Sequence, residues 1–165
     1  MPQPMDKLQV LRETDAAARQ QAQDLLYNSG HAALATLEPA TGWPLASRVS
    51  LAFDAEGTPL ILISRLSAHY DALDTDPRCS LLVGEPGEGD PLRHARMTVV
   101  CLARKLAADE RAQARSQFVA RHPGAAIYAD FADFDFFRLQ PERASLNAGF
   151  GKAYALAARD LRPVA

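Results

Sequence analysis

One predicted strand carries two side chains that could bind an anion. Residues 45–53 alternate apolar and mixed side chains, which predicts a strand with Arg48 and Ser50 on one face and Val49 on the other. The neighbouring position on the Arg48 face is Ala46, so the guanidinium has open space around it. An arginine in such a place either binds an anionic group such as a phosphate or is an ordinary exposed arginine.

A second group of candidate anion ligands surrounds a predicted helix start. Ser67 is a suitable N-cap for a helix over residues 67–75, and the first amides of a helix have no intrahelical acceptor. These amides and the helix dipole favour an anion, and Ser64 and His69 add further donors. The alternative is that Ser67 only caps the helix and that His69 is solvated.

The elements that must position these residues follow from changes in the hydrophobic period. A helical stripe predicts a first helix from Asp6 to Asn28, ending at Gly30. Short apolar runs between turn residues then predict strands over residues 32–37, 45–53, 58–64, 79–83, 97–106, 132–139 and 144–156, the last interrupted at residues 149–151, with helices over 67–75 and 109–121. This order predicts an α+β fold with a small β-barrel core.

Composition excludes several classes of function. Lys plus Arg number 18 and Asp plus Glu 20, so the net charge of −2 argues against a nucleic-acid binder. No apolar stretch approaches the roughly 20 residues that span a bilayer, which argues against a membrane protein. The start, Met1–Lys7, lacks the pattern of a signal peptide. We therefore expect a single-domain cytoplasmic protein.

The cysteines and histidines do not predict a metal centre. Cys79 and Cys101 lie in separate apolar runs and form no zinc-ligand spacing with the histidines, so we expect buried, reduced thiols. His31, His94 and His122 each occupy positions typical of solvated or capping histidines. No metal ligand is therefore assigned.

Eight short segments, taken in order, carry a resemblance to a known family. They are residues 33–37 (ALATL), 44–49 (PLASRV), 62–69 (LISRLSAH), 76–82 (DPRCSLL), 89–92 (GDPL), 121–123 (RHP), 128–134 (YADFADF) and 149–153 (GFGKA). The first four resemble the pyridoxamine 5′-phosphate oxidase-like FMN-binding split barrels. The others are similar to the branch that includes the haem-utilisation proteins. The resemblance runs from Ala33 to Leu156.

The resemblance implies a fold and an assembly. It implies a six-stranded antiparallel split β-barrel with peripheral helices, forming a homodimer with FMN between the subunits. One domain would span residues 1–165, with a helix in 1–30 and the barrel in 31–157. The run Leu60–Ile63 is apolar on both faces, so both must be covered, and the resemblance places it partly in the dimer interface.

The resemblance also implies cofactor ligands. Arg48 matches the arginine that contacts the FMN phosphate, and His69 stands where many relatives have a phosphate-binding lysine. Arg96 matches a position at the polar edge of the flavin. With the residues beside them and the donors of the predicted helix start, the expected cofactor-binding set is Arg48, Val49, Ser50, Ile63, Ser64, Ser67, His69 and Arg96.

Three functions remain open at this point. The first is an FMN-dependent oxidoreductase acting on a small-molecule substrate, without an assigned catalytic acid or base. The second is a haem-binding or haem-degrading protein with a histidine as axial ligand. The third is a non-catalytic flavin-binding module, because Tyr70 and Asp71 replace a pair that includes a cation in relatives. Residues 157–165 match no substrate-binding segment of the true oxidases, so oxidation of pyridoxamine phosphate is not expected.

Trp43 could lie over a neighbouring subunit.

Overall fold

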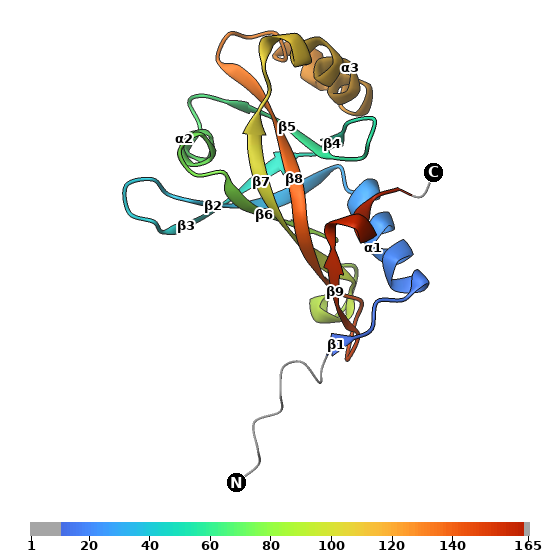
Figure 1. Cartoon of the computed structure of the whole chain (residues 1–165). Coiled ribbons are helices and arrows are strands. Elements are labelled where there is room, and N and C mark those ends of the chain that lie inside the picture. Colours follow the sequence, from blue (N-terminus) through green and yellow to red (C-terminus); the bar gives the residue numbers. More distant parts are fainter. Residues whose placement is uncertain (1–10, 164–165) are drawn as a thin grey trace.

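The computed structural model describes residues 11–163 and shows a mixed α+β fold built on one sheet (Figure 1). The strands are β1 (Leu11–Arg12), β2 (His31–Leu37), β3 (Pro44–Ser50), β4 (Ala52–Phe53), β5 (Pro59–Ser64), β6 (Arg78–Val83), β7 (Arg96–Lys105), β8 (Phe134–Asn147) and β9 (Ala153–Ala157). The α-helices are α1 (Ala16–Asn28), α2 (Ala68–Thr75) and α3 (Arg111–Arg121). None of the helices within residues 11–163 is long and apolar enough to cross a membrane.

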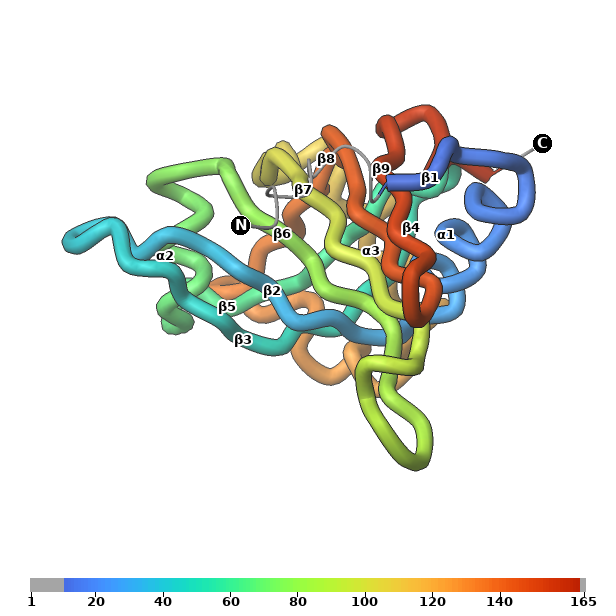
Figure 2. Tube along the Cα trace, turned by 90° about the horizontal axis from the view of Figure 1, so that it is seen from below, coloured from blue at the N-terminus to red at the C-terminus, as the bar shows by residue number. Residues whose placement is uncertain are grey.

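The strands follow the order β1-β9-β8-β7-β6-β2-β3, and β5 pairs with β4 and with β8. All of these pairs are antiparallel except β1 with β9. The sheet curls so that β3 also contacts β5, and the two lie side by side in Figure 2. This arrangement is consistent with a split barrel, while the six-stranded count remains a prediction.

The first helix begins later than the hydrophobic stripe predicts. The Asp15 carboxylate accepts a hydrogen bond from the Ala18 amide at 2.8 Å, which fixes the start of α1 at Ala16. Leu11 instead pairs with Ala153 in the parallel β1–β9 contact. The predicted helix is therefore wrong for residues 11–15, and its first residues, 6–10, lie outside the described part of the chain.

The C-terminal strands are also divided differently from the prediction. One strand, β8, runs through residues 134–147, where we expected two strands separated near Gln140. Pro141, which lacks an amide hydrogen, lies opposite Cys101 at a β-bulge. Val100 lies opposite Arg143, so Glu142 is the additional residue of the bulge. The bulge allows β8 to continue through the proline.

Strand β5 separates two hydrophobic clusters. Ile61 and Ile63 pack in the larger cluster inside the curled sheet. Leu60 and Leu62 pack on its other side with Phe118 of α3 and the remaining members Ala52, Ala114, Ala125, Ala129 and Phe136. The second face of β5 is thus covered by α3 of the same chain. The expectation that Leu60–Ile63 lies partly in a dimer interface is wrong, because these four residues are already buried.

Candidate functional site

The curled sheet leaves one broad face exposed, which we call the outer face. Strand registers align two rows of its side chains across β3, β2, β6, β7 and β8. The first row is Arg48, Ala33, Leu82, Thr98 and Ser145, and the second is Ala46, Ala35, Ser80, Val100 and Arg143. Leu82 is 47% exposed, so no described element covers the centre of this face.

Arg48 lies exposed on the outer face, as the strand pattern predicts. It sits opposite Ala33, and within the described residues it forms no ion pair or hydrogen bond. Its strand, β3, contacts β5, the strand that ends at Ser64. The guanidinium charge is therefore free for an anion.

The two predicted serine donors are used within the protein. Ser64 donates to Oδ2 of Asp133 at 2.8 Å and accepts from the Leu66 amide at 3.1 Å. Ser67 occupies the predicted N-cap position of α2, but its hydroxyl donates to the Ser64 carbonyl at 2.7 Å. Neither hydroxyl is free, so the anion site at α2 retains mainly its backbone amides.

His69 and its surroundings supply little positive charge. The imidazole is half-buried, and burial lowers its pKa from the usual 6.5. It is therefore mostly neutral near pH 7. Asp71, in the first turn of α2, adds a negative charge near the helix start, where an acid opposes binding of an anion. Of the predicted phosphate ligands, Arg48 is the one with a free positive charge.

The other predicted cofactor ligands divide between core and surface. Val49 and Ile63 are 6% and 3% exposed, and both belong to the larger hydrophobic cluster. Ser50 is exposed on the outer face, opposite His31. The structure thus leaves Ser50 beside Arg48 as an accessible group, while Val49 and Ile63 support the strands from within.

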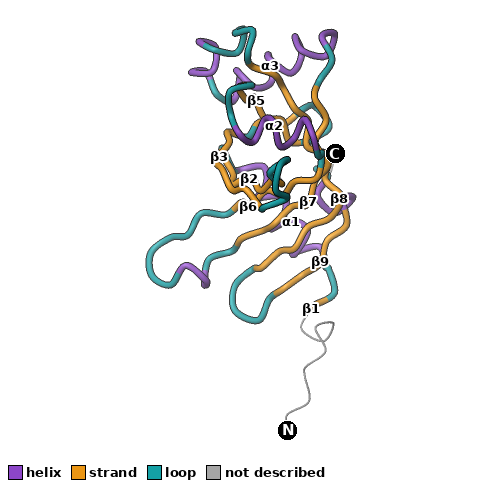
Figure 3. Tube along the Cα trace, turned by 90° about the vertical axis from the view of Figure 1, so that its left-hand side faces the viewer, coloured by secondary structure: helices purple, strands orange, loops and turns teal. Residues whose placement is uncertain are grey.

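Arg96 organises a loop. Its Nη1 donates to the carbonyls of Leu92 and His94 at 3.1 and 3.4 Å. The side-chain amide of Asn147 is oriented so that its nitrogen donates to the Gly149 carbonyl. In this orientation the amide oxygen of Asn147 accepts a hydrogen bond from Nη2 of Arg96 at 3.3 Å. These bonds link the β6–β7 and β8–β9 loops, which project on the same side of the molecule (Figure 3). The guanidinium is used for this link.

One histidine lies on the outer face, which the sequence analysis did not foresee. His31 shares the exposed side of β2 with Ala33, and its Nε2 lies 2.7 Å from Oε1 of Glu85. In contrast, His94 and His122 contact backbone carbonyls through Nε2, at 2.9 and 2.6 Å. Side chains alternate along β2, so the sequence could have predicted that His31 shares a face with Ala33. It could not have predicted the contact between His31 and Glu85.

Cys79 and Cys101 are buried and form no disulfide, although they lie directly opposite each other on β6 and β7. The hydrogen bond with Cys79 and then burial raise the pKa of the Cys101 thiol. This disfavours the reactive thiolate. Among residues 11–163, no group of three or more His, Cys, Asp and Glu could hold a metal ion.

Comparisons with known proteins agree with this architecture. The family model for pyridoxamine 5′-phosphate oxidase matches residues 18–148, which is most of the chain. This chain belongs to that family. A curated relative is the non-canonical haem oxygenase HOZ, chloroplastic, of Arabidopsis thaliana, 33% identical over 115 residues. That match covers 68% of this chain and 34% of the relative, so the chain spans about a third of the relative's length.

Solved structures place this family member near haem-utilisation proteins. A haem-binding protein from Mycobacterium smegmatis is 28% identical with a TM-score of 0.81, covering 90% of this chain and 61% of that one. HutZ, a haem storage protein from Vibrio cholerae, is 25% identical with a TM-score of 0.62, and the match covers 81% of this chain and 94% of HutZ. The expected family and branch are thereby confirmed.

Proposed function

We propose that this chain binds haem on its outer face, as a homodimer with the cofactor between the subunits. The observation that carries the proposal is the outer face itself. Its centre is built from small and apolar side chains, and Arg48 stands free at one side. An open face of small side chains leaves room for a planar macrocycle, and a free arginine suits one of its carboxylates. The named haem proteins among the relatives support the same choice.

Exposed apolar side chains on the outer face support the proposed dimer. Leu82 and Leu102 on the outer face are 47% and 41% exposed, and alanines occupy the positions around Arg48. Large apolar side chains that are exposed on a sheet face are typical of an interaction surface. A second copy placed on it would also shield a bound macrocycle from water.

Two residues are proposed to hold the haem. Arg48 would pair with a propionate, and His31 would approach the iron from the outer face. Glu85 holds the His31 imidazole at 2.7 Å, the kind of carboxylate contact that orients a metal-bound histidine. When bound, haem supplies an iron centre that can react with oxygen. The protein's part is to orient the macrocycle and limit access of water to it.

A titration of the purified chain with haemin tests this proposal. We expect a sharp Soret band, about tenfold or more weaker haem affinity in Arg48→Ala, and an altered Soret band in His31→Ala. Arg159→Ala and His94→Ala are matched controls, since Arg159 lies in another exposed segment and the His94 ring contacts the Glu88 carbonyl. Equal haem affinity in Arg48→Ala and Arg159→Ala would refute the role of Arg48.

FMN is the second candidate cofactor, and one observation favours it. Arg48 carries a free charge on β3, a strand that contacts β5, and Ser67 precedes the first amides of α2; a free arginine and helix N-terminal amides both suit a phosphate. In this case the protein would be an oxidoreductase acting on a small molecule, or a flavin-binding module. Arg48→Ala should then weaken FMN binding by about tenfold or more, and unchanged FMN affinity would exclude this candidate.

A further inference from the structure

The turn between β2 and β3 forms a projecting arm, residues 38–43, visible at the edge of the molecule in Figures 1 and 2. The Glu38 amide donates to the Trp43 carbonyl, and the Gly42 amide to the Glu38 carbonyl, both at 2.8 Å. The Trp43 amide also donates to Oγ1 of Thr41 at 3.2 Å. The arm is therefore an ordered turn that presents Trp43 in a defined position.

The indole of Trp43 is largely uncovered by the part of the chain that the structure describes. It is 72% exposed, and it is the single tryptophan of the sequence. An aromatic side chain of this size buries roughly 150–250 Å² when it packs, so leaving it in water forgoes a large apolar contribution. Tryptophans held outside the core in this way are typical anchors of protein interfaces.

An apolar groove begins at the base of the same arm. Leu37 and Pro44 line it at one end, and Val100 and Leu102 line its floor on the outer face. The groove encloses about 470 Å³, and Cys79 and Cys101 lie beneath it. It is large enough for an indole ring.

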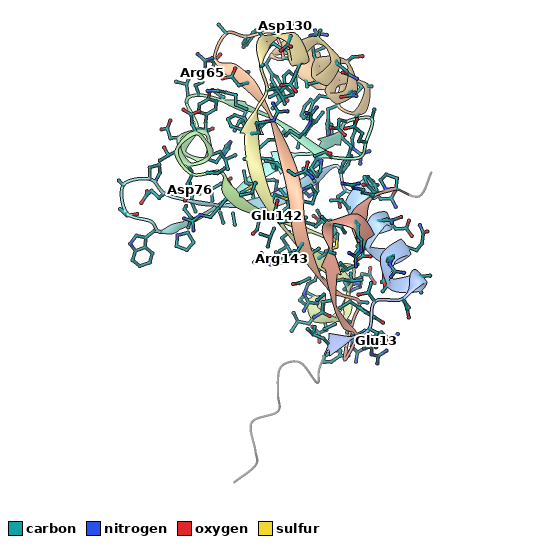
Figure 4. The ribbon with its side chains drawn as sticks, in the orientation of Figure 1. Glu13, Arg65, Asp76, Asp130, Glu142 and Arg143 are labelled. Atoms are coloured by element: carbon teal, nitrogen blue, oxygen red, sulfur yellow. The ribbon has the colours of Figure 1, made fainter. Side chains whose placement is uncertain are left out.

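Charged groups at the rim of the groove complement the arm. Arg143 and Glu142, labelled in Figure 4 along β8, belong to the lining, and neither forms an ion pair within residues 11–163. The free Arg143 guanidinium can stack on an indole face, and the Glu142 carboxylate can accept from an indole N–H. On the arm, the exposed Glu38 places a negative charge beside Trp43.

We propose that the arm of each protomer docks in the groove of a second copy, with Trp43 as its anchor. A two-fold axis near the arm base makes the contact reciprocal, since each copy offers one arm and one groove. The partner arm then closes one side of the outer face. This inference rests on the homodimer of the proposed function and names the contact that assembles it.

The single tryptophan makes its environment measurable in the full-length chain. We expect a dimer by sedimentation, with Trp43 emission at shorter wavelength than free tryptophan amide and with reduced acrylamide quenching. On dilution into monomer, emission should shift to longer wavelength and quenching should increase. A tryptophan in the dimer that is quenched as readily as the free amide would overturn the docking, and so would a chain that stays monomeric.

Three variants separate docking from folding and from cofactor binding. Trp43→Ala should raise the dimer dissociation constant by about tenfold or more, whereas Leu66→Ala, which removes an apolar side chain 89% exposed elsewhere, should leave it unchanged. Leu102→Arg blocks the groove and should give Trp43 a solvent-like emission in a chain with unchanged circular dichroism. An unchanged dimer in Trp43→Ala would overturn the proposal.

The same samples distinguish this inference from the haem proposal. If Trp43 is protected but no Soret band develops with haemin, the docking holds and the cofactor assignment fails. If haem binds to a dimer whose Trp43 remains freely quenched, the docking is overturned and haem binding stands.

Discussion

The Tyr70 hydroxyl donates to Oδ2 of Asp135 at 2.6 Å, which ties the first turn of α2 to the start of β8. The same carboxylate accepts from Nε of Arg65 at 2.9 Å, and Lys105 donates to the Tyr70 oxygen at 3.2 Å. Burial alone would raise the pKa of Asp135, but the bonds from Arg65 and Tyr70 outweigh it and lower the pKa. This network holds the start of α2 in place.

Removing the Tyr70 hydroxyl should therefore loosen α2. We expect Tyr70→Phe to lower the free energy of unfolding by about 1–3 kcal/mol, because a hydrogen bond to a charged acceptor in a half-buried place is lost. Urea denaturation measures the change. Tyr128→Phe is the matched control, since the Tyr128 hydroxyl bonds to no described residue. Equal stability of the two variants would show that the network contributes little.

The smaller hydrophobic cluster should depend on α3. Phe118 is 1% exposed and packs against Phe136 with ring centroids 5.8 Å apart. We expect Phe118→Ala to destabilise the fold by about 3–5 kcal/mol through loss of buried surface and formation of a cavity. Phe131→Ala removes the same side chain where it is 52% exposed and should cost far less. Thermal or urea unfolding of the two variants measures the loss of stability in each. A small loss in Phe118→Ala would contradict the burial of Leu60 and Leu62 of β5 by α3 of the same chain.

Acid should weaken the fold through Glu110. Hydrogen bonds from Arg104, and next from the Ala107 amide, lower the pKa of Glu110 from 4.5 to about 2. A carboxylate with a depressed folded-state pKa stabilises fully above its unfolded pKa and loses this contribution as the pH falls through the folded value. We expect the free energy of unfolding to decrease between about pH 4.5 and 2, and less steeply in Glu110→Gln. Glu88→Gln, at an exposed site, should keep the full slope.

A positive charge introduced at residue 69 should strengthen FMN binding. His69 has a pKa lowered by burial, so near pH 7 it adds little positive charge to the start of α2. We expect His69→Lys to tighten FMN binding by about tenfold, as measured by quenching of flavin fluorescence. Haem affinity, which depends on the outer face in this account, should change little. An unaltered FMN affinity would show that residue 69 does not reach the phosphate.

The sequence predicted most elements but not their long-range partners. The helical stripe was extended towards Asp6 because Leu11 fits the helical period, whereas Leu11 pairs with Ala153, a contact far along the chain. Residues 140–143 were expected to separate two strands, whereas a bulge at Pro141, opposite Cys101, lets β8 continue through them. The doubly apolar Leu60–Ile63 correctly predicted cover on both faces, but periodicity does not say which element supplies it.

The candidate site was predictable to a similar degree. Strand alternation placed Arg48 on an exposed face, and turn chemistry placed Ser67 at the N-cap. Residue type alone did not show that the Ser67 hydroxyl bonds the Ser64 carbonyl or that Arg96 holds its own loop. Such contacts depend on where the backbone carbonyls point after folding.

The most direct test of the central claim is a competition between the two cofactors. The purified chain is incubated with equal concentrations of haemin and FMN, separated from free cofactor by gel filtration, and its visible spectrum recorded. We expect a sharp Soret band that elutes with a dimer and is reduced in Arg48→Ala but not in Arg159→Ala. The twin bands of retained flavin without a Soret band would contradict haem binding on the outer face, and a colourless protein would contradict both cofactors.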